Sequence, residues 1–430
     1  MPLPQPERPF KTPAPPTIAG STVKPLGWYT DYKDPSRFLN IKDIRPLFNE
    51  IAQHKNISDI IIKTGEPVCI KTKRFGLRAI THRIINVDEV NVFATELSGD
   101  KAIAGRIAKG DAISGLASLL ESAEYDHATG IQGEKRRYRY EIMACSSKLK
   151  FEGISIILRP LPSKPTSYDQ LNIPLSFIQN CIVKDGTVII AGATGEGKST
   201  TLAALIRYIL ENDTIIKGNI LTHEDPIEVS YDEVDTEHSM VTQSAIGMGQ
   251  HILSFNHANR SAMRRSPDLV LLGELRDEDT VEAAVELSLT GHPVYATTHA
   301  SSISAIMPRL ISRFPQELQA QKAFDLIDTL RFLVAQKLIW TTEGKLMAVR
   351  ETLVITEALK NYLLPFTKST DVLYRKINQI MDKELLGAVS YKGQANRLLE
   401  DGIIDEKNYR YLVGAGVQFT DEELKKLDDL

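Results

Sequence analysis

The sequence predicts an α/β protein in which an N-terminal α+β domain precedes a second α/β domain and a helical C-terminal region. Helical and strand-like apolar patterns alternate from about residue 38, and a proline-containing segment separates two such parts. A glycine-rich loop at 192–200 joins a β-branched run to a helical pattern in the second part. The chain has 430 residues, 42% hydrophobic and 25% charged, which is an ordinary globular composition for two or three domains.

Composition also suggests where the domains begin and end. The first 35 residues hold nine of the 21 prolines, a content typical of an extended arm that docks on a partner or remains a tail. The predicted parts are a proline-rich arm at 1–37, an N-terminal domain at 38–162, a linker at 163–174, a second domain at 175–360 and a helical region at 361–430.

Apolar spacing predicts the elements of the first domain. Residues 38–55 and 87–110 have helical periodicity, and residues 58–80 read as paired strands. Two further strands are expected at 136–146 and 153–161. In the C-terminal region, Thr420 and Glu423 fit a capping box at the start of a last helix.

Charge and cysteine content exclude several classes of protein. A formal charge of −4 provides no general attraction to nucleic acid, so direct binding to it is not expected. The three cysteines lie far apart, which suits reduced thiols in the cytoplasm and cannot supply a four-cysteine zinc site. No apolar run of about 18 residues or signal-peptide core is found. We therefore expect a cytoplasmic protein that reaches a membrane through partners.

The stretch GATGEGKST at 192–200 has the spacing of a phosphate-binding loop. Its backbone N–H groups would surround the β-phosphate of a nucleotide, while Lys198 reaches the β- and γ-phosphates and Ser199 holds Mg²⁺. Glycines permit the positive φ angles and the close approach of the backbone that such a loop needs. The predicted nucleotide-binding residues are Gly192, Thr194, Gly195, Gly197, Lys198, Ser199 and Thr200.

Two glutamates follow strand-like runs of the second domain. Glu224 ends the run in NILTHEDPIEV, at the strand edge where ligands bind in parallel sheets, and could orient or deprotonate an attacking water. The same turn is also a good helix start, which leaves that alternative open. After the apolar run 269–272, Gly273 stands where an aspartate is usual, so Glu274 is expected to hold Mg²⁺ through a water.

Two histidines flank the next strand-like run, in TGHPVYATTHASS. His292 precedes the run and His299 follows it. Either could sense the γ-phosphate or contact a neighbouring subunit, although a lone histidine is more often structural.

The order GATGEGKST, ILTHEDPIE, MRRSPDLVLLGELRD and TGHPVYATTHASS resembles the Walker A, Asp box, Walker B and His box of the PilT and GspE superfamily of secretion ATPases. This resemblance implies homohexameric rings in which a PAS-like domain precedes a RecA-like P-loop ATPase domain, with ATP and Mg²⁺ as cofactors. It makes Glu224 a water-activating candidate, Glu274 the Walker B glutamate, and His292 and His299 the His-box pair.

Departures from the family pattern narrow the expectation. The four-cysteine zinc element of the assembly ATPases is missing, and the C-terminal AIRNLIRE-type motif of retraction ATPases is not evident. The sequence resembles most the DotB and TraJ branch, which implies a type IVB secretion or conjugative transfer apparatus at the inner membrane as partner. A pilus retraction ATPase and a DNA-translocating motor are the alternatives, the latter because KRRYRY at 135–140 interleaves basic and aromatic residues. A P-loop kinase fits less well, since the strand-end glutamates would have no role in it.

Two arginines of the N-terminal domain match positions of family arginines that reach the γ-phosphate of a neighbouring subunit. In a strand, alternation places Arg139 on the face opposite Tyr138 and Tyr140, and Arg159 opposite Leu158. A solvated basic strand face is the simpler alternative. The resemblance makes Arg139 and Arg159 candidate catalytic residues that act on the next subunit.

Overall fold

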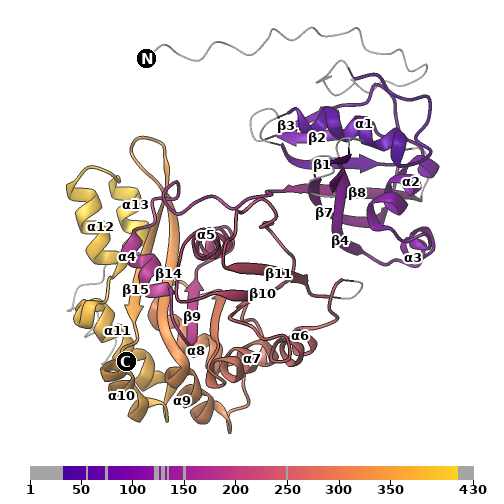
Figure 1. Cartoon of the computed structure of the whole chain (residues 1–430). Coiled ribbons are helices and arrows are strands. Elements are labelled where there is room, and N and C mark those ends of the chain that lie inside the picture. The colour runs from indigo at the N-terminus through magenta and orange to yellow at the C-terminus, as the bar shows by residue number, and fades with distance from the viewer. Residues whose placement is uncertain are drawn as a thin grey trace, which may run out of the picture. The chain divides into compact units, whose positions relative to one another are not determined.

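The chain divides into two units, with the boundary between Ser163 and Lys164. Each unit has its own sheet and core. Figure 1 draws the first unit in indigo to purple and the second in magenta to yellow. This computed structural model describes residues 32–54, 57–72, 76–120, 125–126, 131–132, 135–148, 152–247 and 250–414. Thr420, Glu423 and most of the predicted arm lie outside these residues. Within them, no helix has the length and apolar character needed to cross a membrane.

The first unit is a six-stranded antiparallel sheet with the order β3-β2-β1-β8-β7-β4. Its strands are β1 Ile57–Lys63, β2 Cys69–Thr72, β3 Gly76–Ala79, β4 Ile113–Leu120, β7 Lys135–Cys145 and β8 Gly153–Leu161. A separate pair consists of β5 Tyr125–Asp126 and β6 Ile131–Gln132. Its helices are α1 Ile41–Ala52, α2 Val87–Ser98 and α3 Ile103–Ala108, and all three contribute to one core with the sheet.

The side-chain alternation expected for β7 and β8 is confirmed. Tyr138, Tyr140 and Ile142 are buried, as are Ile156 and Leu158 on the neighbouring strand. The residues between them lie on the other face of the sheet.

The helix expected at 87–110 is two helices instead. α2 ends because Gly99 adopts a left-handed conformation with φ 69°, which closes the helix by a bond from its N–H to the carbonyl of Thr95. The chain then restarts as α3 at Ile103. Apolar spacing continues through the break, which is why periodicity alone predicts a single helix.

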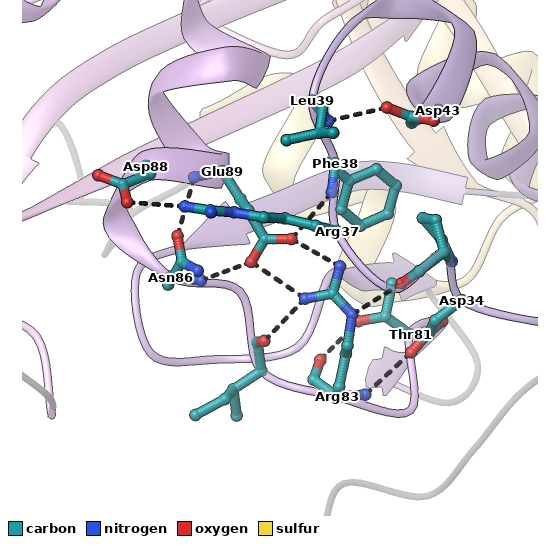
Figure 2. A network of polar contacts seen from close by, with 12 residues as sticks. Asp34, Arg37, Phe38, Leu39, Asp43, Thr81, Arg83, Asn86, Asp88 and Glu89 are labelled. Carbon is teal, nitrogen blue, oxygen red and sulfur yellow. Dashed lines mark hydrogen bonds and ion pairs between the residues drawn. The ribbon is translucent and has the colours of Figure 1, made fainter.

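A buried glutamate ties the segment before α1 to α2, as Figure 2 shows. The side chain of Glu89 is 2% exposed and accepts two hydrogen bonds from Arg83, at 2.6 and 3.0 Å. It also accepts the backbone N–H groups of Phe38 and Asn86, at 3.0 and 3.1 Å. Burial raises the pKa of Glu89, but these hydrogen bonds outweigh it and hold the pKa below its usual range.

The second unit is built on a seven-stranded sheet with the order β11-β10-β12-β13-β9-β14-β15. Neighbours from β11 to β14 are parallel, and β15 is antiparallel to β14. The strands are β9 Gly186–Ala191, β10 Gly218–Glu224, β11 Ser239–Ala245, β12 Leu269–Leu272, β13 Pro293–Thr298, β14 Leu330–Trp340 and β15 Leu346–Val354. β9, β12 and β13 are buried on both faces, as parallel strands covered by helices are.

Helices cover the two faces of this sheet. α4 Leu175–Cys181 and α5 Lys198–Glu211 pack on one face with Val188 and Ile190 of β9. On the other face, Ile189 and Ala191 join a core formed with the helices between residues 278 and 413. The remaining helices are α6 Phe255–Ala262, α7 Glu278–Leu289, α8 Ile303–Ile311, α9 Gln319–Thr329, α10 Glu357–Leu363, α11 Thr370–Asp382, α12 Tyr391–Glu400 and α13 Glu406–Val413, with short 3₁₀ turns η1 Leu364–Phe366 and η2 Leu385–Gly387.

The buried Glu89 generates a stability prediction. Arg83→Met should lower the unfolding free energy of the first unit by about 3 kcal/mol at pH 7, because it leaves a buried carboxylate without its cation. The pKa of Glu89 is depressed in the folded chain, so its stabilisation is present above the unfolded value near 4.3 and is lost as pH falls through the folded value. The difference between variant and wild type should therefore shrink in acid.

Hydrogen exchange of the β1 amides in urea would measure this effect within the intact chain. Arg37→Met is the matched control, since the Arg37 and Asp88 side chains are 49% and 71% exposed and their pair is worth less than about 1 kcal/mol. Equal losses for the two variants would show that burial of Glu89 does not make its ion pair important.

Candidate active site

The phosphate loop connects β9 to α5, as its sequence predicts. β9 ends at Ala191 and α5 begins at Lys198, and the loop between them contains Gly195 and Gly197 with φ of 86° and 74°. These left-handed angles favour glycine and turn the backbone toward the N-terminus of α5. A 14-residue helix directed at the loop contributes unpaired N–H groups and the positive end of its dipole.

The loop lies directly against β14. A Cβ atom on Gly192 would stand 2.7 Å from the carbonyl oxygen of Gln336, and one on Gly197 would stand 3.2 Å from its Nε2. The side chain of Gln336 also donates to the carbonyl of Glu196 at 2.5 Å. Glycine is therefore required at 192 because the backbone of the neighbouring strand occupies the space of a side chain.

The ammonium group of Lys198 lies inside the loop. Its Nζ donates to the carbonyl oxygens of Gly192 and Ala193, both at 2.9 Å. Burial lowers the pKa of Lys198, and nearby carboxylates, with Glu274 foremost, oppose that shift. The positive charge thus lies where the motif would have it meet a nucleotide's phosphates.

A pocket of about 430 Å³ opens beside the loop, at the carboxyl ends of the parallel strands. Most predicted site residues of the second domain line this pocket: Thr194, Gly195, Gly197, Lys198, Ser199, Thr200, Glu224, Glu274 and His299. Gly192, the first residue of the loop, packs against the backbone of β14 and does not line the pocket. The pocket lies at the carboxyl edge of the sheet because the parallel strands β9, β10, β12 and β13 all end there.

Glu224 is the last residue of β10 and is held by two neighbours. Its carboxylate accepts a hydrogen bond from Thr222 Oγ1 at 2.6 Å and one from Gln243 Nε2 at 3.2 Å. Burial raises the pKa of Glu224, against the effect of these donors. A carboxylate with a raised pKa in a nucleotide pocket is suited to accept a proton from water.

Glu274 follows β12 and pairs with a histidine from the next strand. His299 Nε2 lies 3.3 Å from its carboxylate, so the predicted Walker B glutamate and one histidine of the predicted pair meet in the pocket. Gly273, in the place of the usual aspartate, donates to the carbonyl of His223 at 2.8 Å. A Cβ atom at 273 would lie 3.2 Å from that oxygen, so the close packing of β12 on β10 favours glycine there.

The other histidine lies at the opposite end of β13. His292 precedes the strand, and its Nδ1 lies 3.1 Å from Thr290 Oγ1 and 3.3 Å from the carbonyl of Leu287. It does not line the pocket. A role for His292 stays a prediction. Because His292 lies away from the pocket, contact with a neighbouring subunit fits its position better than sensing of the γ-phosphate.

Sequence reasoning missed an arginine of the pocket. Arg276 donates to Asp225 at 2.9 Å and lies 5.4 Å over the ring of Phe255, and all three residues line the cavity. Arg276 comes two residues after Glu274, and the sequence motifs assign it no role. Its proximity to the strand-end glutamate is the one signal that could have indicated a second cation in the site.

The two candidate arginines of the first unit are directly opposite each other on β7 and β8. Arg159 is not free: its Nε and Nη2 donate to Asp59 Oδ1 at 3.1 and 2.9 Å, and the Asp59 side chain is 9% exposed. The Arg139 side chain makes no hydrogen bond or ion pair within the part of the chain that the structure describes. The residues that line the pocket all belong to the second unit.

The side chains present fit a magnesium nucleotide. Ser199 Oγ and the carboxylate of Glu274 are hard oxygen ligands of the type that Mg²⁺ prefers, and both line the pocket. In the described ranges, no three His, Cys, Asp or Glu side chains gather as a metal site. Mg²⁺ would therefore take most of its ligands from phosphate oxygens and water, which is its usual mode with nucleotides.

A parallel sheet with a phosphate loop at its centre and glutamates at adjacent strand ends defines a P-loop nucleotide hydrolase. The Type II/IV secretion system protein family matches residues 152–361 of this chain. Among curated relatives, YggR of Escherichia coli is 34% identical over 57% of this chain and 72% of its own length. The type IV pilus retraction ATPase PilT of Pseudomonas aeruginosa is 32% identical over 60% of this chain and 71% of its own.

Solved structures cover both units. The DotB ATPase of Legionella pneumophila matches with a TM-score of 0.76 and 31% identity, over 89% of this chain and 98% of its own. The DotB ATPase of Yersinia pseudotuberculosis matches with a TM-score of 0.70 and 34% identity, over 90% and 97%. The chain belongs to the type II/IV secretion system family, within the PilT and GspE superfamily of ATPases. These matches confirm the expected fold class, an N-terminal domain followed by a RecA-like domain.

The position of Lys198 generates the first functional prediction. Lys198→Ala should lower ATP hydrolysis by orders of magnitude, because it removes the cation expected to contact the β- and γ-phosphates. The fold should persist, since the loop lies at the surface of its domain. Turnover of ATP, with circular dichroism as the check of folding, measures the effect. Lys217→Ala is the control, because Lys217 is an exposed lysine paired with Asp213 outside the pocket, and unchanged turnover in Lys198→Ala would refute the assignment.

The two glutamates should separate chemistry from binding. Glu224→Gln and Glu274→Gln keep the side-chain shape, so each should bind ATP within about threefold of wild type and hydrolyse it about 10² to 10⁴ times more slowly. Because burial raises the pKa of Glu224, wild-type turnover should fall in acid along a limb centred above the ordinary glutamate value of about 4.3.

Equilibrium binding of a non-hydrolysable ATP analogue and single-turnover rates across pH provide both measurements. Loss of ATP binding in both variants, with normal hydrolysis per bound nucleotide, would show that the glutamates act at a different step.

Proposed function

We propose that this chain hydrolyses Mg-ATP as a subunit of a homohexameric ring that energises a type IVB-like secretion or conjugative transfer apparatus. The observation that carries the proposal is the convergence of Lys198, Glu224 and Glu274 in one pocket beside the phosphate loop. Lys198 would hold the phosphates, Glu224 would orient or deprotonate the attacking water, and Ser199 with Glu274 would hold Mg²⁺. Phosphoryl transfer needs mainly such positioning and charge stabilisation.

Similarity to DotB supports the secretion branch. Both DotB structures match about nine-tenths of this chain, so the likeness extends across the first unit as well as the ATPase unit. The curated PilT relative matches 60% of the chain at comparable identity, which keeps pilus retraction as the second candidate. On either reading, the ring would act in the cytoplasm and meet the inner membrane through partner proteins.

The buried aromatic residues of β7 weigh against direct DNA binding. Tyr138 and Tyr140 in KRRYRY are 3% and 6% exposed, because they pack into the core of the first unit. Rings in a core cannot stack on the bases of a single strand, which is the contact that such sequences provide in DNA-binding proteins. The interleaved pattern in this stretch reflects a strand with one apolar face.

Replacing the chromosomal or plasmid copy with Lys198→Ala tests the cellular role. Secretion or transfer should stop while the protein level stays constant, and a pilus retraction defect with normal secretion and transfer would instead support the second candidate. The Arg37→Met variant serves as the control for expression, since its exposed ion pair contributes little.

The two arginines should act on the next subunit. Arg139→Ala should leave ATP affinity nearly unchanged and lower turnover by about 10³-fold, the low end for an arginine that contacts a γ-phosphate in trans. Mixing Arg139→Ala with Lys198→Ala protein should restore part of the activity, because some sites then combine an intact loop with an intact arginine. Turnover of mixed and unmixed rings, after subunit exchange is shown with labelled wild type, measures this.

The Asp59 pair provides a second comparison. Asp59→Asn removes the carboxylate charge that holds Arg159, so a trans-acting Arg159 should keep or gain activity, whereas Arg159→Ala should lose it. Equal losses in Asp59→Asn and Arg159→Ala would show that the ion pair matters for folding alone. If mixed rings recover nothing although subunits exchange, the arginines do not act in trans.

A further inference from the structure

Glu196 is the acidic residue of the phosphate loop, and its side chain bonds to the C-terminal part of the chain. The hydroxyl of Tyr411, on α13, donates to Glu196 Oε1 at 3.0 Å, across 215 residues of sequence. The other carboxylate oxygen accepts the backbone N–H of Leu338 on β14. The two oxygens therefore bond to the neighbouring strand β14 and to the last described helix, α13.

A carboxylate at this place has an electrostatic cost for phosphate binding. The loop is built to surround an anion, so a second anion within it would weaken that binding unless it is turned aside. Tyr411 and Leu338 supply the two donors that keep the Glu196 carboxylate on the β14 side. Glu196 does not line the pocket, whereas Gly195 and Gly197 on either side of it do.

The backbone of Glu196 is held by a buried polar group on the same strand. Gln336 donates to the Glu196 carbonyl, and its Oε1 accepts from Thr201 Oγ1 at 2.9 Å and from Arg350 Nε at 2.7 Å. Arg350 and Gln336 are 9% and 1% exposed. The backbone of Glu196 is thus held by buried residues of the core. Only its side chain is free to change conformation.

Helix α13 is held in place by a lysine of β14. Lys337 Nζ donates to the carbonyls of Tyr411 and Leu412, at 3.3 and 3.2 Å, at the end of α13 where a cation favours the helix dipole. The ammonium also lies 5.2 Å from the ring centre of Tyr411 and 4.5 Å from that of Tyr391. Tyr411 itself is 49% exposed, so its hydrogen bond can be broken without unpacking a core.

We propose that Tyr411 is a positioning residue for the phosphate loop, and that through Glu196 the helix α13 sets the affinity of the chain for ATP. The bond keeps the carboxylate away from the phosphates and keeps the loop in the conformation that its N–H groups need. A change that lifts α13 would release Glu196 and weaken nucleotide binding, which gives the C-terminal helices a means to control the pocket. This inference rests on the ATPase function proposed above.

Tyr411→Phe removes the hydroxyl and nothing else. It should raise the KM for ATP about fivefold, the effect of losing one net hydrogen bond, with kcat within about twofold of wild type. Tyr409→Phe is the matched control on the same helix, since the Tyr409 hydroxyl bonds to Asn396 at 3.0 Å and not to the loop. Steady-state kinetics and the binding of a non-hydrolysable ATP analogue, both with the full chain, provide the readouts.

A double-mutant cycle separates this role from general stability. Glu196→Ala removes the charge together with the tether, so adding Tyr411→Phe to it should change KM no further, which is the non-additivity expected of partners in one bond. Melting temperatures without nucleotide should fall alike in Tyr411→Phe and Tyr409→Phe, whereas KM should rise only in the first. An unchanged KM in Tyr411→Phe, or additive effects in the double variant, would overturn the proposal. A wild-type chain that does not hydrolyse ATP would instead refute the proposed function.

Discussion

Strand β9 lies between β13 and β14, buried on both faces, and everything in the active site depends on how closely its loop packs on β14. The absent side chain of Gly192 lets the loop rest on the carbonyl of Gln336. That contact fixes where α5 begins, and hence where Lys198 and the helix N-terminus point. A close backbone contact is a stronger constraint than a hydrogen bond here, because it leaves no room for the loop to shift toward the sheet.

The carboxylates of the pocket illustrate how strand order turns distant sequence into one site. Glu224 and Glu274 are 50 positions apart, yet β10 and β12 are neighbours in parallel register and end at the same edge. Close packing at Gly273 leaves no room for an aspartate there, and the first carboxylate after the strand is Glu274, two residues past the end of β12. There it meets His299, which follows the next strand in the sheet. Glu274 can therefore take the place of the aspartate that is usual at position 273.

Local patterns were enough to predict most of the secondary structure and the lining of the pocket. The phosphate loop and the strand-end glutamates can each be predicted from a few consecutive residues, because glycine backbone angles and strand ends depend on local sequence. The break at Gly99 was not predicted, since apolar spacing continues across it. Two hydrogen-bonded pairs join residues far apart in sequence: Arg276 with Asp225, 51 positions apart, and Tyr411 with Glu196, 215 positions apart. The sequence around each residue does not indicate its partner. Such contacts are decided by tertiary packing alone.

Glu351 shows that the C-terminal helices are not a detachable module. This buried side chain on β15 accepts the backbone N–H of Ile303, at the start of α8 just beyond the loop that carries His299, at 3.0 Å. It also accepts the N–H of Tyr391, at the start of α12, at 3.3 Å. A lineage that shortened the chain before α12 would leave this carboxylate with half its donors in an apolar surrounding. Loss of α12 would therefore destabilise the ATPase core itself.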